Sequence, residues 1–183
     1  MKRLIDRTVR RALRRVRGDN DLDDFRRAGA VIADSVLANG LRINKNDCFL
    51  VTIEESVVFG PDVLILAHDA SLRPELGYTR IAPVYVGRGS FIGARATILA
   101  GSNIGSDCII AAGSVVSGNL EPGSVYGGVP ARRLGSKTNH LAKWEQVAEH
   151  GPQFNEGWKL TLGRKEGRET MRDAIGDGNG WVY

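Results

Sequence analysis

An aliphatic side chain recurs at every sixth position through the middle of this chain. This column consists of Val86, Ile92, Ile98, Ile104, Ile110 and Val116. A second column, two positions earlier in each repeat, holds mostly small residues: Val84, Ser90, Ala96, Ser102, Cys108 and Ser114. A period of six fits neither the roughly 3.6-residue turn of an α-helix nor the alternation of a hairpin. It predicts short strands joined by tight corners, three to a coil, with the coils stacked about 4.8 Å apart.

The repeat extends toward the N-terminus and is interrupted once. Ile53, Phe59 and Ile65 keep the six-residue spacing, and residues 30–43 are typical of a looser first coil. The step from Ile65 to Val86 is 21 residues, three more than one 18-residue coil, so a loop is expected to leave the stack over residues 66–83. Glycine, at 23 of 183 residues, is about twice as frequent as usual. The corners account for part of this excess, because glycine tolerates the left-handed backbone of tight turns.

The segments that flank the repeat have a different pattern. One apolar face of an arginine-rich helix over residues 2–17 is marked by Ile5, Val9, Leu13 and Val16. A second helix is expected around residues 140–147. We therefore expect three parts: a basic N-terminal helical segment at 1–27, a coiled domain at 28–136 with its loop at 66–83, and a C-terminal helix and tail at 137–183.

The net charge of +4 is unevenly distributed. Residues 1–18 carry eight basic side chains and one acid, whereas the remainder carries 17 basic and 20 acidic side chains. Two interpretations stay open for helix 2–17: it lies on an anionic membrane surface, or it packs on the coils or a neighbouring subunit. Nucleic-acid binding is not expected, because the helix lacks interleaved aromatic residues. Two cysteines and no long apolar run predict a cytoplasmic protein, membrane-peripheral under the first interpretation.

Three elements together resemble a known family: the unbroken six-residue run, the LILAHDAS that precedes it and the closing GSVYGGVPARRLG. They are similar to hexapeptide-repeat acyltransferases, in particular to galactoside/maltose and polysaccharide O-acetyltransferases, over about residues 28–136. The resemblance implies an all-β fold, a left-handed parallel β-helix, here with helical flanks at both ends. It also implies a homotrimer that binds acetyl-coenzyme A between neighbouring subunits and acetylates a sugar hydroxyl, with a role in polysaccharide or glycan biosynthesis.

His68 is the candidate catalytic residue. A sugar hydroxyl is a poor nucleophile at neutral pH, and a histidine is suited to remove its proton during attack on a thioester. His68 is the only histidine within the repeat region, and it falls where the chain leaves the coils. The family's catalytic histidine occupies such a position, which implies the role of general base for His68. Asp69 follows it and is a candidate for orienting the imidazole, although an exposed turn carboxylate is the alternative.

The resemblance also implies residues that hold the two substrates. For the coenzyme these are an aromatic side chain, small corner residues and arginines of the closing motif, namely Phe91, Gly93, Ala94, Ala112, Gly113, Arg132 and Arg133. The small residues also fit plain turn positions. Gly118 departs from the family, where many members have a lysine that helps to hold the nucleotide end. Asn46 and Glu54 keep the eight-residue spacing of an Asn/Asp pair that contacts sugar hydroxyls in galactoside enzymes, with a one-residue gap downstream.

Other functions fit parts of the sequence. An amino-sugar N-acetyltransferase is a rival, and an amine needs less help from a base. A non-catalytic trimeric scaffold would keep the coils, but His68 together with the VPARR ending argues against it. A zinc carbonic anhydrase on this fold needs three histidines; His140 and His150 lie outside the coils, so no metal is expected. Serine acetyltransferase shares the VPAR ending but also has a large helical domain and a GGTGK-like loop, which are missing here.

Overall fold

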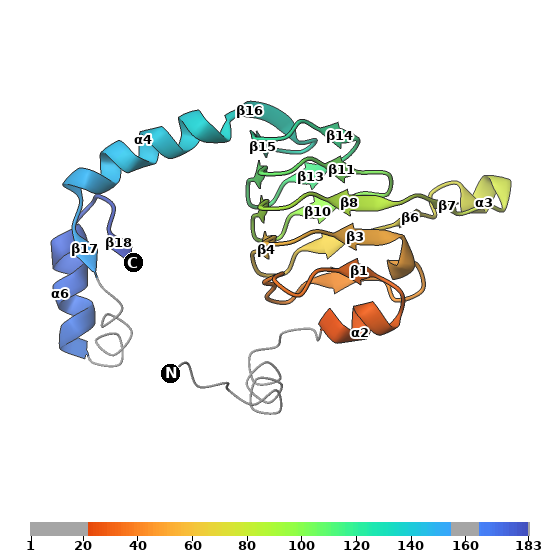
Figure 1. The fold of residues 1–183 in the computed structure, drawn as a ribbon, viewed down its shortest axis with the longest axis horizontal. Coiled ribbons are helices and arrows are strands. Elements are labelled where there is room, and N and C mark those ends of the chain that lie inside the picture. The colour runs from red at the N-terminus through yellow and green to blue at the C-terminus, as the bar shows by residue number, and fades with distance from the viewer. Residues whose placement is uncertain (1–21, 155–164, 183) are drawn as a thin grey trace. The chain divides into compact units, whose positions relative to one another are not determined.

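Three sheets form the three sides of a parallel β-helix in the computed structural model, which describes residues 22–154 and 165–182 (Figure 1). The first sheet contains β1 (Val31–Ile32), β3 (Val51–Ile53), β8 (Val84–Val86), β11 (Asn103–Ile104) and β14 (Asn119–Leu120). The second contains β4 (Val58–Phe59), β9 (Phe91–Ile92), β12 (Ile109–Ile110), β15 (Ser124–Gly127) and β16 (Arg132–Ser136). The third contains β2 (Arg42–Ile43), β5 (Leu64–Ile65), β10 (Thr97–Ile98) and β13 (Val115–Val116). The chain visits the sheets in this order on each coil, and only β16 runs antiparallel to its neighbour within them.

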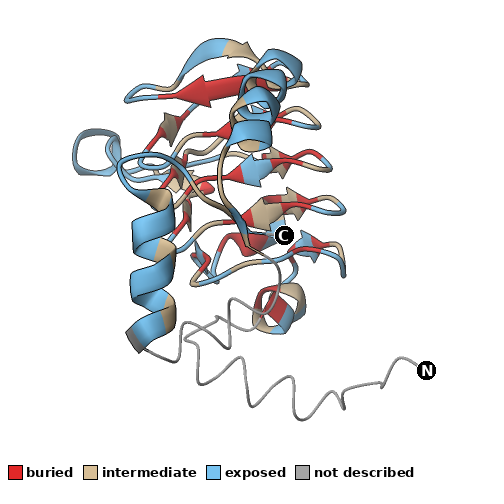
Figure 2. Cartoon of the chain, turned by 90° about the vertical axis from the view of Figure 1, so that its left-hand side faces the viewer, coloured by how far each residue is buried: buried red, intermediate tan, exposed pale blue. Residues whose placement is uncertain are grey.

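The aliphatic column fills the interior of the coils. Ile92, Ile98 and Ile104 are completely buried, and equivalent residues of successive coils are paired, as Ile98 is with Val116. Figure 2 shows these buried stretches recurring coil after coil. The small column is buried as well, and its hydroxyls bond to backbone carbonyls: Ser102 Oγ donates to Leu99 O at 2.6 Å. The six-residue period therefore predicts the strands and the core correctly.

The corners between the sides use left-handed backbone. Gly89 and Gly113 have φ values of 65° and 69°, as the glycine excess predicts. Arg95 and Asp107 occupy the corresponding places on other corners with φ of 58° each, a conformation in which a side chain carries a steric cost. Glycine is thus favoured at the corners without being required at every one.

The largest departure from the coils begins after β5. The chain runs through β6 (His68–Asp69), α3 (Arg73–Leu76) and β7 (Arg80–Ile81) before it re-enters the stack at β8. β6 and β7 pair antiparallel, so residues 66–83 form an arm that projects from the side of the stack, with α3 at its tip (Figure 1). The coil before it has a smaller excursion at the same corner, between β2 and β3, which contains the 3-10 helix η1 (Cys48–Leu50). We call this turn from the third sheet to the first the excursion corner.

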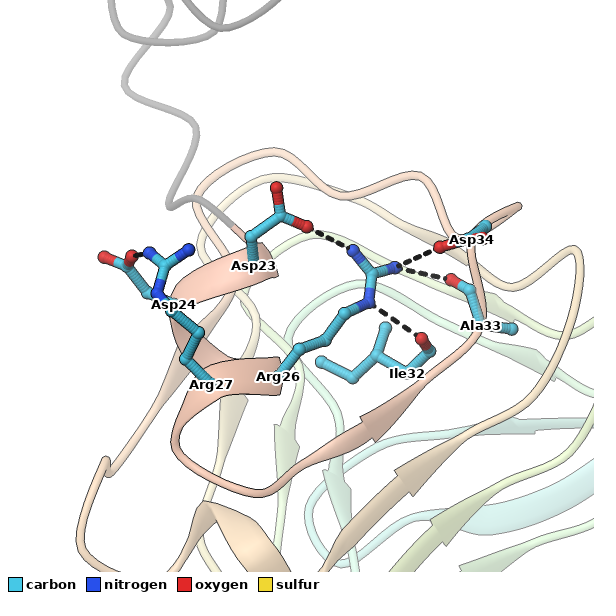
Figure 3. Close-up of polar contacts among 7 residues, drawn as sticks. All are labelled: Asp23, Asp24, Arg26, Arg27, Ile32, Ala33 and Asp34. Carbon is cyan, nitrogen blue, oxygen red and sulfur yellow. Dashed lines mark hydrogen bonds and ion pairs between the residues drawn. The ribbon is translucent and has the colours of Figure 1, made fainter. Parts of the chain in front are cut away.

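The N-terminal end of the stack is covered by α2 (Leu22–Arg27), whose Leu22 and Phe25 are buried in the core. Arg26 joins this helix to the first coil (Figure 3). Its Nε donates to Ile32 O at 2.9 Å and its Nη2 to Ala33 O at 2.8 Å. Its Nη1 bonds to Asp23 Oδ1 at 2.7 Å. The guanidinium therefore satisfies backbone carbonyls of the first coil.

The helix predicted over residues 2–17 lies outside the described residues.

Residues 138–183 form a second compact unit. Its described elements are α4 (Lys137–His150), β17 (Gln153–Phe154), α6 (Lys165–Ile175) and β18 (Trp181–Val182), and α4 covers the segment 140–147 where a helix is expected. β17 and β18 pair parallel, and the rings of Trp144 and Trp181 meet edge to face with centroids 6.0 Å apart. Aromatic packing of this kind stabilises the small unit.

Candidate active site

His68 and Asp47 meet at the excursion corner. Nδ1 of His68 lies 2.6 Å from Oδ2 of Asp47. Asp47 is buried, with a relative exposure of 7%, whereas the His68 side chain keeps 29% of its surface accessible. An ionised carboxylate can only accept a hydrogen bond, so Nδ1 carries the proton and donates it to Asp47. The contact leaves Nε2 as the ring nitrogen that can accept a proton from a substrate.

The position of Asp47 follows from the smaller excursion. Asp47 precedes η1 and its carbonyl accepts the N–H of Leu50 at 3.0 Å. The next residue, Cys48, is completely buried, and its Sγ approaches Ala28 O at 3.3 Å. The buried Cys48 side chain holds the turn in place, and the turn directs the Asp47 carboxylate toward the imidazole of His68 on the next coil.

A groove of about 430 Å³ opens beside the imidazole. It is lined by Leu66, His68, Asp69, Arg80, Leu99, Ala100, Gly101, Ser117 and Gly118. These residues come from the base of the arm and from the excursion corners of later coils, so stacking brings together positions as far apart as 68 and 118. The volume is within the range of sites that bind small molecules. Gly118 contributes to this wall without a side chain.

Asp69 lines the groove, but its carboxylate bonds elsewhere. Its Oδ1 accepts the N–H of Ser71 at 2.9 Å, and hydrogen bonds from Ser71 hold the pKa of Asp69 below its usual value. The carboxylate that contacts the imidazole is Asp47, which the sequence interpretation did not identify. A signal for it exists: Ile43 and Ile65 are paired on adjacent coils yet lie 22 residues apart, which reveals extra residues at the corner that contains Asp47.

The two predicted acceptor residues belong to different corners. Asn46 is exposed at the excursion corner, next to Asp47. Glu54 follows β3 at the corner between the first and second sheets, where its Oε2 accepts the N–H of Arg88 at 2.8 Å. The Tyr85 hydroxyl and the Arg88 amide lower the pKa of Glu54. Glu54 does not line the groove beside His68, so a single chain does not bring Asn46 and Glu54 together at this groove.

The predicted coenzyme residues form a second group, away from His68. Phe91, Gly93, Ala94, Ala112 and Gly113 lie on β9 or on the corners between the second and third sheets. Two of these corners are joined directly, since Gly113 N–H donates to Ala94 O at 2.8 Å. The side chain of Phe91 is on the outer face of the second sheet and is 45% exposed.

The two predicted arginines lie on β16. Arg133 Nε donates to Ser124 Oγ at 3.2 Å and lies 3.5 Å from Glu121. Arg132 is exposed and bonds to the carbonyl of Ala131. Neither lines the groove at His68 in one chain.

Similarity to known proteins agrees with this geometry. Residues 83–118 match the family described as bacterial transferase hexapeptide (six repeats). A protein of Escherichia coli (strain K12) that carries the name lipopolysaccharide biosynthesis O-acetyl transferase WbbJ is 28% identical over 69% of this chain and 70% of its own length. Galactoside O-acetyltransferase of the same organism is 33% identical over 47% of this chain, which spans 44% of that protein.

A solved structure has the same fold. A maltose O-acetyltransferase from Clostridium difficile 630 superimposes with a TM-score of 0.51 at 24% identity, over 71% of this chain and 85% of its own. The family match and this neighbour imply the left-handed winding that the sequence predicts.

The stacked coils and the match over residues 83–118 make this protein similar to the hexapeptide-repeat acyltransferases. The two curated relatives described above carry the names of O-acetyltransferases. Across residues 22–154 and 165–182, no group of three or more His, Cys, Asp or Glu side chains is arranged to hold a metal ion. In the same ranges, no helix has both the length and the apolar character needed to span a membrane.

Proposed function

We propose that this protein transfers an acetyl group from acetyl-coenzyme A to a hydroxyl of a sugar or glycan, with His68 as the general base. The observation that carries the proposal is the 2.6 Å contact between His68 and the buried Asp47 at the edge of the groove. A carboxylate on Nδ1 fixes the tautomer and stabilises the imidazolium that forms during proton transfer. The names of the O-acetyltransferase relatives support the choice of a hydroxyl acceptor.

The reaction needs no covalent enzyme intermediate. The acceptor oxygen attacks the thioester carbonyl carbon, and its proton moves to Nε2 of His68 as the new C–O bond forms. The tetrahedral adduct then collapses, the C–S bond breaks, and the imidazolium returns the proton to the departing thiolate. The products are the acetylated sugar and free coenzyme A. Asp47 stays ionised throughout and acts on the imidazole alone.

Replacement of the base tests this function. His68→Ala should lower turnover on the natural acceptor by about 10²–10⁴-fold. His150→Ala is the matched control, because His150 lies on α4 and is exposed. The acceptor itself is found by mass spectrometry after incubation of a sugar and glycan panel with acetyl-coenzyme A. Near-normal turnover of His68→Ala would contradict the proposal and favour an amine acceptor, which depends less on a base.

Coenzyme binding is tested separately from turnover. A catalytic β-helix should bind coenzyme A saturably in a calorimeter, and a scaffold should not. We propose that the pantetheine arm contacts Phe91 and the four corner residues described above, with Arg132 and Arg133 at the phosphates. Arg132→Met should then weaken binding by about 10-fold through loss of a charge-assisted contact.

We also propose a homotrimer in which the outer face of the second sheet meets a neighbouring copy. Outward residues of that sheet form an apolar ladder of paired neighbours: Leu37, Val58, Phe91 and Ile109. Leu37→Glu should dissociate the trimer in sedimentation experiments. Val31→Glu is the control, because Val31 is also 62% exposed, as Leu37 is, but lies on the first sheet. A trimer that survives Leu37→Glu would place the interface elsewhere.

We also propose that the protein is cytoplasmic and that residues 2–17 contact an anionic membrane surface. These residues lie outside the described part of the chain. Anionic vesicles at low salt provide the test, because each basic residue near such a surface contributes about 1 kcal/mol. Failure to co-sediment with the vesicles would exclude the contact.

A further inference from the structure

Arg80 lies in the same groove as His68. It belongs to β7, where it is the backbone partner of Asp69, and it lines the groove from the arm. Its Nη1 donates to Ala100 O at 3.3 Å. A Cβ atom on residue 101 would come within 2.9 Å of Nη2, so the glycine at this corner leaves room for the guanidinium.

Most N–H donors of the Arg80 guanidinium have no acceptor in the described part of the chain. An arginine presents five N–H donors and cannot lose its charge at neutral pH. Apart from the Ala100 carbonyl, no acceptor contacts Arg80 in the described part of the chain, and no carboxylate there is within 4.0 Å of it. Two other arginines of the coiled unit do lie beside carboxylates: Arg26 beside Asp23 and Arg133 beside Glu121. Asp69 lies across the β6–β7 ladder, but its Oδ1 accepts its hydrogen bond from Ser71; this bonding and, to a smaller extent, the charge of Arg80 lower the pKa of Asp69.

We propose that Arg80 binds an anionic group on the acceptor, so that the enzyme prefers sugars carrying a carboxylate or a phosphate close to the reacting hydroxyl. This inference rests on the proposed function. A guanidinium fork matches both anions through paired hydrogen bonds. The pantetheine arm separates the phosphates of coenzyme A from its sulfur, and on this ground we assign the anion beside Arg80 to the acceptor. Weaker binding of coenzyme A itself by Arg80→Met would overturn this assignment and place the coenzyme's phosphates there. The carboxylate of a hexuronic acid and the diphosphate of a nucleotide-linked sugar both supply this chemistry.

Matched acceptors test the preference. The probes are methyl galactoside, the methyl glycoside of galacturonic acid and UDP-galactose, with the corresponding glucose series alongside. We expect Arg80→Met to lower the ratio of kcat/KM for the anionic acceptor to that for the neutral acceptor by about 10- to 100-fold. Arg80→Lys should lower it less, because it keeps the charge and loses the fork. Loss on the uronate alone identifies a carboxylate, and loss on UDP-galactose alone identifies a phosphate.

Arg73→Met is the control, since Arg73 begins α3 at the tip of the arm and does not line the groove. It removes the same charge from the same arm and should leave the ratio unchanged. An equal fall for neutral and anionic acceptors in Arg80→Met would overturn the inference and assign Arg80 to the tetrahedral oxyanion. An unchanged ratio would overturn it as well. If the unmodified enzyme acetylates none of the probes or panel sugars, the proposed function itself fails; thermal unfolding shows that each variant is folded.

Discussion

Nδ1 of His68 and Oδ2 of Asp47 are 2.6 Å apart, although 21 residues separate them in the chain. Each residue sits in an excursion from a different coil, and the two excursions leave the stack at the same corner. Proximity is therefore set by the stacking of coils. A functional pair of this kind depends on the coil register as strictly as the hydrophobic core does.

Asp47→Asn should reduce kcat by about 10- to 100-fold without loss of the fold, because an amide keeps the shape and removes the charge that orients the imidazole. Asp69→Asn should reduce kcat less, since the Asp69 carboxylate bonds to Ser71. Steady-state kinetics on one acceptor compares the two variants. A larger effect at Asp69 than at Asp47 would reverse the roles assigned to these carboxylates.

Two corner glycines should differ sharply in their tolerance of alanine. At Gly93 a Cβ would lie 2.4 Å from the backbone nitrogen of Ala112, so Gly93→Ala should lower the free energy of unfolding by about 3 kcal/mol. At Gly113 no atom is within 4 Å, and only the φ of 69° opposes a side chain, so the loss should be about 1 kcal/mol. Denaturant unfolding measures both values. Equal losses would show that the close approach at Gly93 can relax.

Arg26→Met should destabilise the protein by about 1–3 kcal/mol, because it leaves the carbonyls of Ile32 and Ala33 without their donor. Arg27→Met provides the comparison: Arg27 bonds to Asp24 on the exposed side of α2 (Figure 3), and its loss should change stability by less than about 0.5 kcal/mol. Thermal and denaturant unfolding distinguish the two variants. If both behave alike, the Arg26 contacts do not hold α2 to the first coil.

Glu54 should make stability sensitive to acid. Its pKa is lowered in the folded state from the usual 4.5 by bonds from Tyr85 and Arg88, so the folded state favours the ionised form. The stabilisation is present above pH 4.5 and disappears as the pH falls through the lowered pKa. Glu54→Gln should therefore be less stable than the natural chain at pH 7 and nearly equal to it at about pH 2. A stability difference that does not change with pH would contradict this coupling.

The sequence predicts the coils better than the site. The interior is determined by one-dimensional spacing, so Ile92, Ile98 and Ile104 can be placed by counting. The corner that holds His68 is also predictable, because the step from Ile65 to Val86 is 21 residues. The size of the insertion is predicted wrongly: this step crosses a single corner, where the repeat allows six residues, so the arm adds 15 residues and not the three counted from a full coil. The partnership with Asp47 is harder to predict, since it requires the position of a corner residue in a coil that does not have the standard length. Arg80 is hard to predict for a similar reason: its approach to Ala100 depends on how the arm folds back.

The arm has a consequence for how such enzymes can diversify. Ile65 and Ile98 are neighbours across one rung although 33 residues separate them, whereas Ile98 and Val116 are neighbours at a distance of 18. The strands of adjacent coils thus pair in the same register whether or not a segment is inserted between them, so the sequence of the insertion does not affect the stacking of the coils. His68 and Arg80 both lie within that segment. A transplanted or shuffled arm could carry a new acceptor preference from one scaffold to another while the rungs beneath it remain unchanged.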